Sequence, residues 1–154
     1  MSNSIQNSSE DSQGPVFSGE FRHKIEGKNR ITIPSAWRFG EEVELFMIRR
    51  TLENCIAVMP RCEVMRIKKG ADAMAPEDRA EFLHTFGRNL RQVTLDKGGR
   101  ISIPDEFCQR LGIAGEVMLS GSVDSFNIWN VADFAATNPE NEIQRTKGLR
   151  RHGI

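Results

Sequence analysis

The sequence has 154 residues, of which 38% are hydrophobic and 27% charged, a composition that fits one globular domain or two very small ones and excludes a long disordered chain. Lysine plus arginine and aspartate plus glutamate both total 21, so a nucleic-acid site would have to come from local clustering of charge. The three cysteines form no C-x-x-C pair, residues 1–14 lack the apolar core expected of a signal peptide, and no apolar run is long enough to cross a membrane. We therefore expect a cytoplasmic protein with reduced thiols and no membrane partner.

The first predicted elements are a tail and a β-hairpin. Residues 1–15 are rich in Ser and Asn and carry little apolar bulk, which predicts a flexible tail. Apolar side chains then alternate along residues 16–25, as in a strand with one buried face. Gly27 and Asn29 predict a turn, and residues 30–33 predict the returning strand.

A helical turn and a second hairpin are expected next. Ser35 is a suitable N-cap for a turn of helix that carries Trp37 and Phe39 inward. Residues 43–48 and 55–59 are short apolar runs separated by polar residues, which predicts two more strands.

Two helices are predicted in the middle of the chain. Pro60 suits the first position of a helix that ends at Gly70. A second helix should begin near Pro76, carry an apolar stripe, and end at Gly87. These helices would connect the two halves of the chain.

The second half repeats the elements of the first. Residues 91–104 predict another hairpin, and Asp105 should cap a helix that ends at Gly112. Strands are expected at residues 117–119 and 126–129.

The chain is expected to end in a short helix and a loose tail. Asn130 is placed to cap this helix, and Asn138 and Pro139 should end it. The remaining residues, through Arg151, are polar and basic, and we expect them to be loose.

The two predicted hairpins are copies of one unit. Residues 23–34 superpose on residues 93–104, and each copy reads as an acid, three residues, an arginine, and then apolar, polar, apolar and proline. Neither copy can bury a stable core alone, so the hairpins should interleave about a pseudo-two-fold axis. This packing would bring both basic turns to the same side. The predicted fold class is α+β, mainly β, with short helices.

The predicted domain organisation follows from this repeat. It comprises a flexible tail at 1–15, a first β unit at 18–62, a helical connector at 63–90, a second β unit at 91–134, and a helix end with a loose basic tail at 135–154.

The sequence contains no recognisable catalytic or metal-binding set. His23, His84 and His152 are scattered and fit no catalytic motif, and the spacing of Cys55 and Cys62 is unlike that of a zinc pair. We therefore expect no enzyme activity, no cofactor, no metal and no small-molecule substrate.

The basic turns are the candidate site. An arginine that begins a strand directly after a turn can project from a rigid support and fork onto phosphate or onto guanine. The candidate DNA-binding residues are Arg30, Lys28, Arg100, Lys97, Arg22 and Lys24, and the candidate arginine-orienting residues are Glu26 and Asp96. The simpler alternative, a surface salt bridge of about 0–1 kcal/mol, is less favoured because the arrangement occurs twice.

These motifs resemble a known fold and family. The segments concerned are Gly19 to Phe21 and Lys28 to Pro34 in the first half, and Leu95 to Pro104, Leu111 to Gly112, Val117 to Gly121 and Phe126 to Trp129 in the second. Both copies resemble the SpoVT-AbrB, or swapped-hairpin, DNA-binding fold. Residues 16–134 as a whole resemble the MraZ family of bacterial transcriptional regulators.

The resemblance implies a regulator, usually a repressor, that binds short direct repeats in double-stranded DNA upstream of the division and cell-wall gene cluster. It also implies a ring-like homo-oligomer associated with the nucleoid. The family's D-x-x-x-R signature falls on Asp96 and Arg100, and in the first half on Glu26 and Arg30, where Glu26 replaces the usual aspartate and Asn29 the usual glycine.

Two alternatives remain open. The β unit could be a protein-docking module that does not bind DNA, which salt dependence would distinguish. It could also belong to an AbrB-type antitoxin, although the segment after residue 139 is short for wrapping a toxin.

Overall fold

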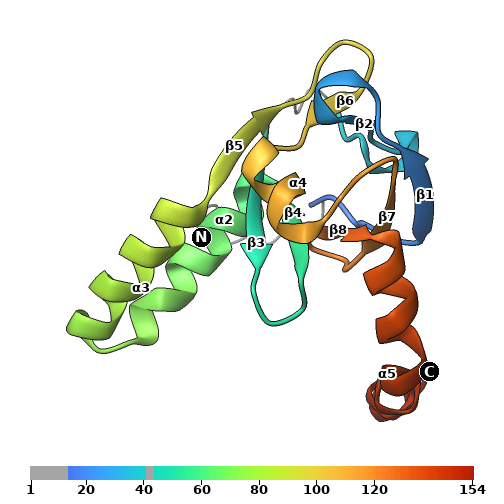
Figure 1. Cartoon of the computed structure of the whole chain (residues 1–154). Coiled ribbons are helices and arrows are strands. Elements are labelled where there is room, and N and C mark those ends of the chain that lie inside the picture. Colours follow the sequence, from blue (N-terminus) through green and yellow to red (C-terminus); the bar gives the residue numbers. More distant parts are fainter. Residues whose placement is uncertain (1–13, 41–43) are drawn as a thin grey trace.

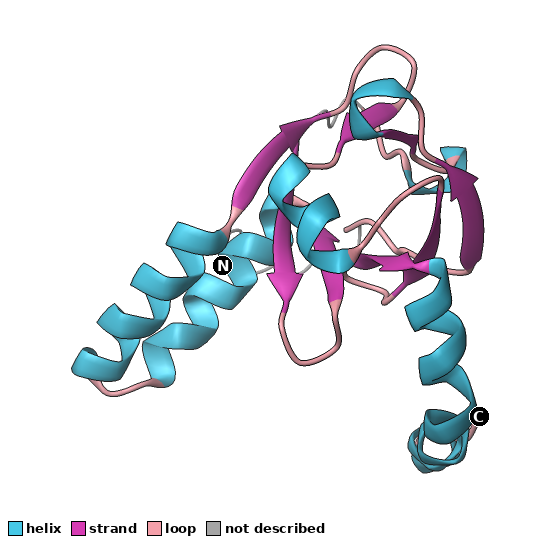
Figure 2. Cartoon of the chain, in the orientation of Figure 1, coloured by secondary structure: helices cyan, strands magenta, loops and turns pink. Residues whose placement is uncertain are grey.

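The computed structural model describes residues 14–40 and 44–154, and their side chains apart from those of residues 138–145. These residues form eight β-strands in a six-stranded sheet and a two-stranded sheet, with helices around them (Figure 1, Figure 2). The strands are β1 (Glu20–Lys24), β2 (Arg30–Thr32), β3 (Glu44–Arg50), β4 (Cys55–Met59), β5 (Arg91–Thr94), β6 (Arg100–Ser102), β7 (Glu116–Gly121) and β8 (Phe126–Asn130). The predicted α+β, mainly β fold is confirmed. Most of the predicted tail, residues 1–13, lies outside the described residues.

Strands from the two halves of the chain pair with each other. The six-stranded sheet has the order β1-β7-β8-β4-β3-β5, and the two-stranded sheet joins β2 to β6. The first strand of each half therefore pairs with a strand of the other half, β1 with β7 and β5 with β3. The two units are interleaved, as their small size required.

The hairpins expected at residues 16–33 and 91–104 are wrong as paired ladders. Glu26 and Arg30 form a single bridge, with the Glu26 N–H donating to the Arg30 carbonyl at 2.8 Å. The equivalent Asp96 N–H donates to the Arg100 carbonyl at 2.9 Å. Beyond these contacts, each three-residue returning strand uses its hydrogen bonds on the other copy, because that pairing also buries its apolar side chains.

Equivalent residues face each other across the pseudo-two-fold axis. Ile31 pairs with Ile101 in the small sheet, and Ala57 pairs with Asn127 in the large sheet. The turns are linked reciprocally as well: the Ile33 N–H donates to the Gly99 carbonyl at 2.8 Å, and the Ile103 N–H donates to the Asn29 carbonyl at 2.9 Å. The small sheet therefore lies on the axis and joins the two turns.

The core lies between the two sheets and is built from both copies. Ile31 and Ile101 are at most 1% exposed. Trp37, predicted to point inward, is buried and packs on Phe126 with ring centroids 4.8 Å apart. Its counterpart in the second copy, Phe107, is also buried. Because this core is shared, neither copy can bury its apolar side chains without the other.

The middle helices project from the sheet as an antiparallel pair (Figure 1). The helical elements of the described residues are η1 (Gly27–Asn29), η2 (Ser35–Trp37), α2 (Arg61–Gly70), η3 (Ala71–Ala73), α3 (Pro76–Asn89), α4 (Asp105–Leu111) and α5 (Val131–Arg151). Pro60 is the N-cap of α2 and not its first residue. The expected end of α3 at Gly87 is wrong, because the helix continues until Leu90 turns into extended backbone and leads into β5.

The C-terminal helix is longer than predicted. Asn130 caps α5 as expected, accepting a hydrogen bond from the Ala132 N–H at 2.8 Å. The predicted end at Asn138 and Pro139 is wrong, and so is the loose tail through Arg151, since α5 continues to Arg151. An interior proline removes one helical hydrogen bond and either kinks or ends a helix, and here the helix continues past Pro139. α5 changes direction along its length (Figure 1).

No helix among the described residues combines the length and apolarity needed to span a bilayer.

Candidate nucleic-acid interface

The two basic turns lie together at one end of the molecule. Pairing of β2 with β6 places the segment after Ile25 next to the segment after Leu95. In Figure 1 both turns are at the top, away from the α2–α3 pair and α5. The two basic turns therefore lie on the same side of the molecule, as the duplication led us to expect.

The second turn is fixed by Asp96. Its Oδ1 accepts hydrogen bonds from the N–H groups of Gly98 at 2.8 Å and Arg100 at 2.9 Å, and its Oδ2 accepts one from Arg100 Nε at 3.1 Å. The hydrogen bond from the Arg100 N–H, more than any other contact, holds the pKa of the Asp96 carboxyl below its ordinary value. Asp96 thus contacts both the backbone and the side chain of Arg100.

The first turn holds its arginine differently. Arg30 Nε donates to the Gly27 carbonyl at 3.0 Å. Within residues 14–40 and 44–154, no carboxylate lies within ion-pair distance of Arg30. Lys28 and Asn29 take left-handed backbone conformations, with φ of 64° and 55°. The Asn29 side-chain amide donates to the Asp105 carboxylate of the other copy.

Glu26 does not orient Arg30, and this prediction is wrong. Its carboxylate accepts a hydrogen bond from Arg100 Nη1 at 3.1 Å and so contacts the opposite copy. Glutamate is one methylene longer than the equivalent Asp96. That length allows it to cross between the two turns, and it does not fold back onto its own.

The two arginines consequently differ in charge balance. Arg100 contacts one carboxylate from each copy, and the hydrogen bond that it donates to Glu26 is the largest cause of the raised pKa of its guanidinium. Arg30 has a backbone carbonyl as its partner, and no carboxylate among the described residues balances its charge. An incoming anion would meet an uncompensated charge at Arg30 and a neutralised one at Arg100.

The predicted lysines add exposed charge to this end. Lys28 and Lys97 lie in the turns, and Lys24 ends β1 just before the first turn. All three are exposed, and none forms an ion pair with a described residue. Arg22, further along β1, pairs with Glu116 at 2.7 Å, so its charge is partly compensated.

Sequence reasoning missed Arg38. A side chain at Gly99, where φ is 77°, would collide with the Arg38 guanidinium, so this glycine allows the arginine to lie directly against the second turn. No carboxylate in the described part of the chain pairs with Arg38. The repeat gave no signal for this residue, because the equivalent position in the second copy is Cys108.

The described residues contain no group of three or more His, Cys, Asp or Glu side chains placed to hold a metal ion. The arginines and lysines of this end can offer an anionic partner electrostatic attraction and directed hydrogen bonds.

The two halves of this chain repeat one β unit and pair their strands with each other, which is the arrangement of the swapped-hairpin class of proteins. A family model described as "MraZ protein, putative antitoxin-like" matches residues 87–152. The chain is 31% identical to a protein of Corynebacterium jeikeium over 136 residues, 86% of this chain and 94% of the relative. It is 32% identical to one of Natranaerobius thermophilus (75% and 81%) and 29% identical to one of Clostridium tetani (82% and 89%). All three relatives are named "Transcriptional regulator MraZ".

The chain belongs to the MraZ family. The relatives carry the name of a regulator and not of an enzyme, in agreement with the predicted absence of catalytic activity.

Proposed function

We propose that this protein is a transcriptional regulator that binds double-stranded DNA sequence-specifically through its paired basic turns. The names of its relatives support the regulatory class. The observation that carries the DNA-binding proposal is Arg30, a guanidinium on a rigid turn that meets no carboxylate among the described residues and that shares this turn with the exposed Lys28.

The residues divide into two roles. The lysines are point charges on exposed stems and suit phosphates, which position a protein on the duplex. Arg30 can fork onto a phosphate or onto guanine O6 and N7. Arg100 takes the same role once DNA competes with Glu26 for its terminal nitrogens, while Arg22 and Lys24 add charge along β1.

A single chain offers few such contacts, so its own affinity for DNA is low. We infer a ring-like homo-oligomer that presents several chains to short direct repeats, so that effective concentration raises the affinity. Repeat spacing would then contribute to specificity. The targets we propose are promoter repeats of the division and cell-wall gene cluster, bound as a repressor on nucleoid DNA in the cytoplasm.

Retardation of DNA from upstream of the protein's own gene tests this function. Arg30→Gln should weaken binding at least about tenfold, because a charge-assisted hydrogen bond contributes about 1.5–3 kcal/mol. Arg88→Gln is the matched control, since Arg88 is an exposed arginine in the last turn of α3 and belongs to neither basic turn. Oligomer size, measured by light scattering, should be the same for all three proteins. Normal DNA binding by Arg30→Gln would refute the proposed interface.

Salt dependence separates DNA binding from protein docking. The logarithm of the DNA-binding constant should fall with the logarithm of salt concentration by about 0.9 per neutralised phosphate. The antitoxin alternative is supported by the words "antitoxin-like" in the description of the family model that matches residues 87–152. A stoichiometric partner protein that co-purifies with the chain would favour that alternative.

A further inference from the structure

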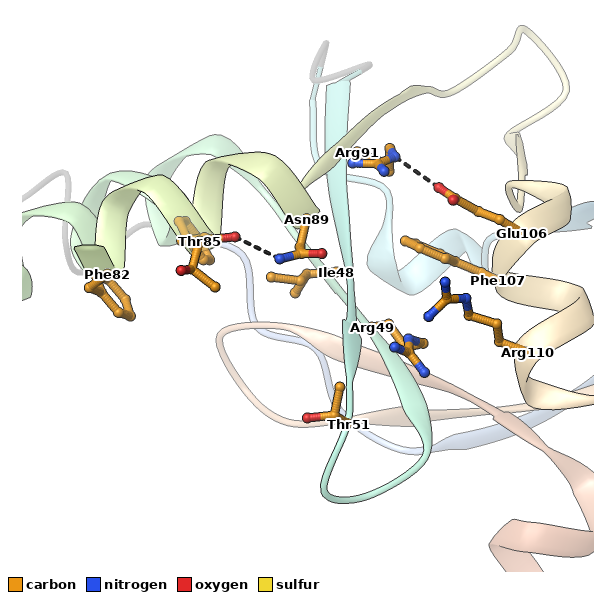
Figure 3. A pocket seen from close by; sticks show the side chains of 11 residues that line it. Ile48, Arg49, Thr51, Phe82, Thr85, Asn89, Arg91, Glu106, Phe107 and Arg110 are labelled. Carbon is orange, nitrogen blue, oxygen red and sulfur yellow. Dashed lines mark hydrogen bonds and ion pairs between the residues drawn. The ribbon is translucent and has the colours of Figure 1, made fainter. Parts of the chain in front are cut away.

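A cavity of about 410 Å³ lies between α3, β3 and α4, apart from the basic turns (Figure 3). Its walls come from β3 and the turn after it, from α3, from the first residue of β5 and from α4, and the proposed DNA-binding site uses none of its lining residues. The cavity combines three arginines, one glutamate and several aromatic side chains. This mixture of charge and apolar surface is typical of a site for a small organic molecule.

The charge of the cavity is unbalanced. Arg49 of β3 and Arg110 of α4 point into it from two sides (Figure 3). Neither arginine forms an ion pair with any residue that the structure describes. Arg91 pairs with Glu106 at 3.0 Å, and its Nη1 also donates to the Arg88 carbonyl at 2.7 Å. Three guanidinium groups therefore face one carboxylate, and an anion in the cavity would reduce their mutual repulsion.

The apolar part of the wall is aromatic. Phe82 and Phe86 of α3 stack in parallel, with ring centroids 5.8 Å apart, and both are half-buried. Phe107 of α4, a buried residue of the core, also lines the cavity. Flat apolar groups pack well against such rings, and the adjacent guanidinium planes offer forked hydrogen bonds to a carboxylate, sulfonate or phosphate.

We propose that this cavity binds a small organic anion that carries a flat apolar body. The anionic group lies between Arg49 and Arg110, and the apolar body lies against Phe82 and Phe86. Glu106 opposes the ligand, because it brings a like charge to the edge of the site.

The position of the cavity links it to the second basic turn. Arg91 begins β5, which leads into Asp96, and Glu106 lies in α4, which follows β6. An anion that draws Arg91 away from Glu106 changes a contact between the two elements that flank this turn. This consequence for DNA binding rests on the proposed function, whereas ligand binding itself does not.

Two fluorescent probes test the site on the full-length protein without DNA. 8-Anilinonaphthalene-1-sulfonate has the required anion and flat body, and N-phenyl-1-naphthylamine has the same body without the charge. The sulfonate should bind with enhanced, blue-shifted fluorescence, and Arg49→Gln/Arg110→Gln should raise its Kd about tenfold or more, the loss expected for charge-assisted hydrogen bonds. Arg88→Gln, on α3 but outside the cavity, should leave the Kd unchanged.

Glu106→Gln provides a second, opposite test. Removing the opposing carboxylate should tighten sulfonate binding by up to about fivefold, the range of an exposed ion pair, and should not change binding of the neutral probe. The proposal is overturned if both probes bind equally well, or if the double arginine variant, shown to be folded by circular dichroism, binds the sulfonate like the wild type. Because the readout is fluorescence, failure of the DNA-binding proposal would not affect it.

Discussion

The two basic turns descend from one sequence pattern, yet they hold their arginines in different ways. Arg100 is held by Asp96 of its own turn and by Glu26 of the other. Arg30 rests on the Gly27 carbonyl and meets no carboxylate among the described residues. One methylene separates Glu26 from the aspartate at the equivalent position. The comparison shows that a duplicated scaffold can carry one neutralised and one uncompensated arginine.

The backbones of the two turns differ as well. Gly99 takes the left-handed conformation at no steric cost, whereas Lys28 and Asn29 take it as residues with side chains. Asn29 is among the residues that tolerate this region, and its side chain is held by Asp105. The first turn therefore depends on side-chain contacts for a shape that the second turn obtains from glycine.

Substituting the left-handed position of each turn tests this difference, with the largest effect in the second. Gly99→Ala should lower the free energy of unfolding by about 2 kcal/mol, because an L-residue with positive φ costs roughly 1–2 kcal/mol and the added methyl group collides with Arg38. Urea denaturation monitored by tryptophan fluorescence measures the change.

The matched variant in the first turn is Asn29→Gly. Glycine relieves the strain of φ 55° but removes the hydrogen bond to Asp105. These effects oppose each other, so the change should stay within about 1 kcal/mol. Equal losses in the two variants would show that the two turns are held in the same way.

Releasing Arg100 should make the two turns more alike. Glu26→Gln removes one of the two carboxylates that neutralise Arg100, so DNA affinity should rise by up to about fivefold, as for loss of an exposed ion pair. Glu20→Gln on β1 removes the same charge without freeing an arginine and serves as the control. If both variants bind DNA equally well in a retardation assay, the contact between Glu26 and Arg100 does not limit binding.

Much of the fold could be predicted because it depends on patterns within the sequence. The repeat located both turns, the apolar alternation located most strands, and Asn130 and Gly112 marked helix boundaries that the structure confirms. Strand pairing was harder, since β1 and β2 are adjacent in sequence but are paired with β7 and β6. The choice depends on where apolar faces are buried together, which no local pattern records.

The candidate site shows a similar limit. Asp96 and Arg100 could be paired from their spacing, because both belong to one short turn. The contact between Glu26 and Arg100 and the position of Arg38 against Gly99 could not, because they arise when the two copies pack together. The end of α5 was also missed: Pro139 locally favours termination, but the residues that follow it continue the helix.

The smallest effect that distinguishes the turns is the pH dependence contributed by Asp96. Its pKa in the folded protein lies below the ordinary value of 3.8, so the folded state releases this proton more readily than the unfolded state does. The ionised carboxylate therefore stabilises the fold above that value, and the stabilisation is lost as the pH falls through the folded pKa.

Asp96→Asn should be less stable than the wild type between about pH 5 and pH 7. Urea titrations at a series of pH values should show the difference shrinking below about pH 4 and disappearing at lower pH. A difference that stays constant down to pH 2 would mean that the carboxylate charge of Asp96 does not hold the second turn.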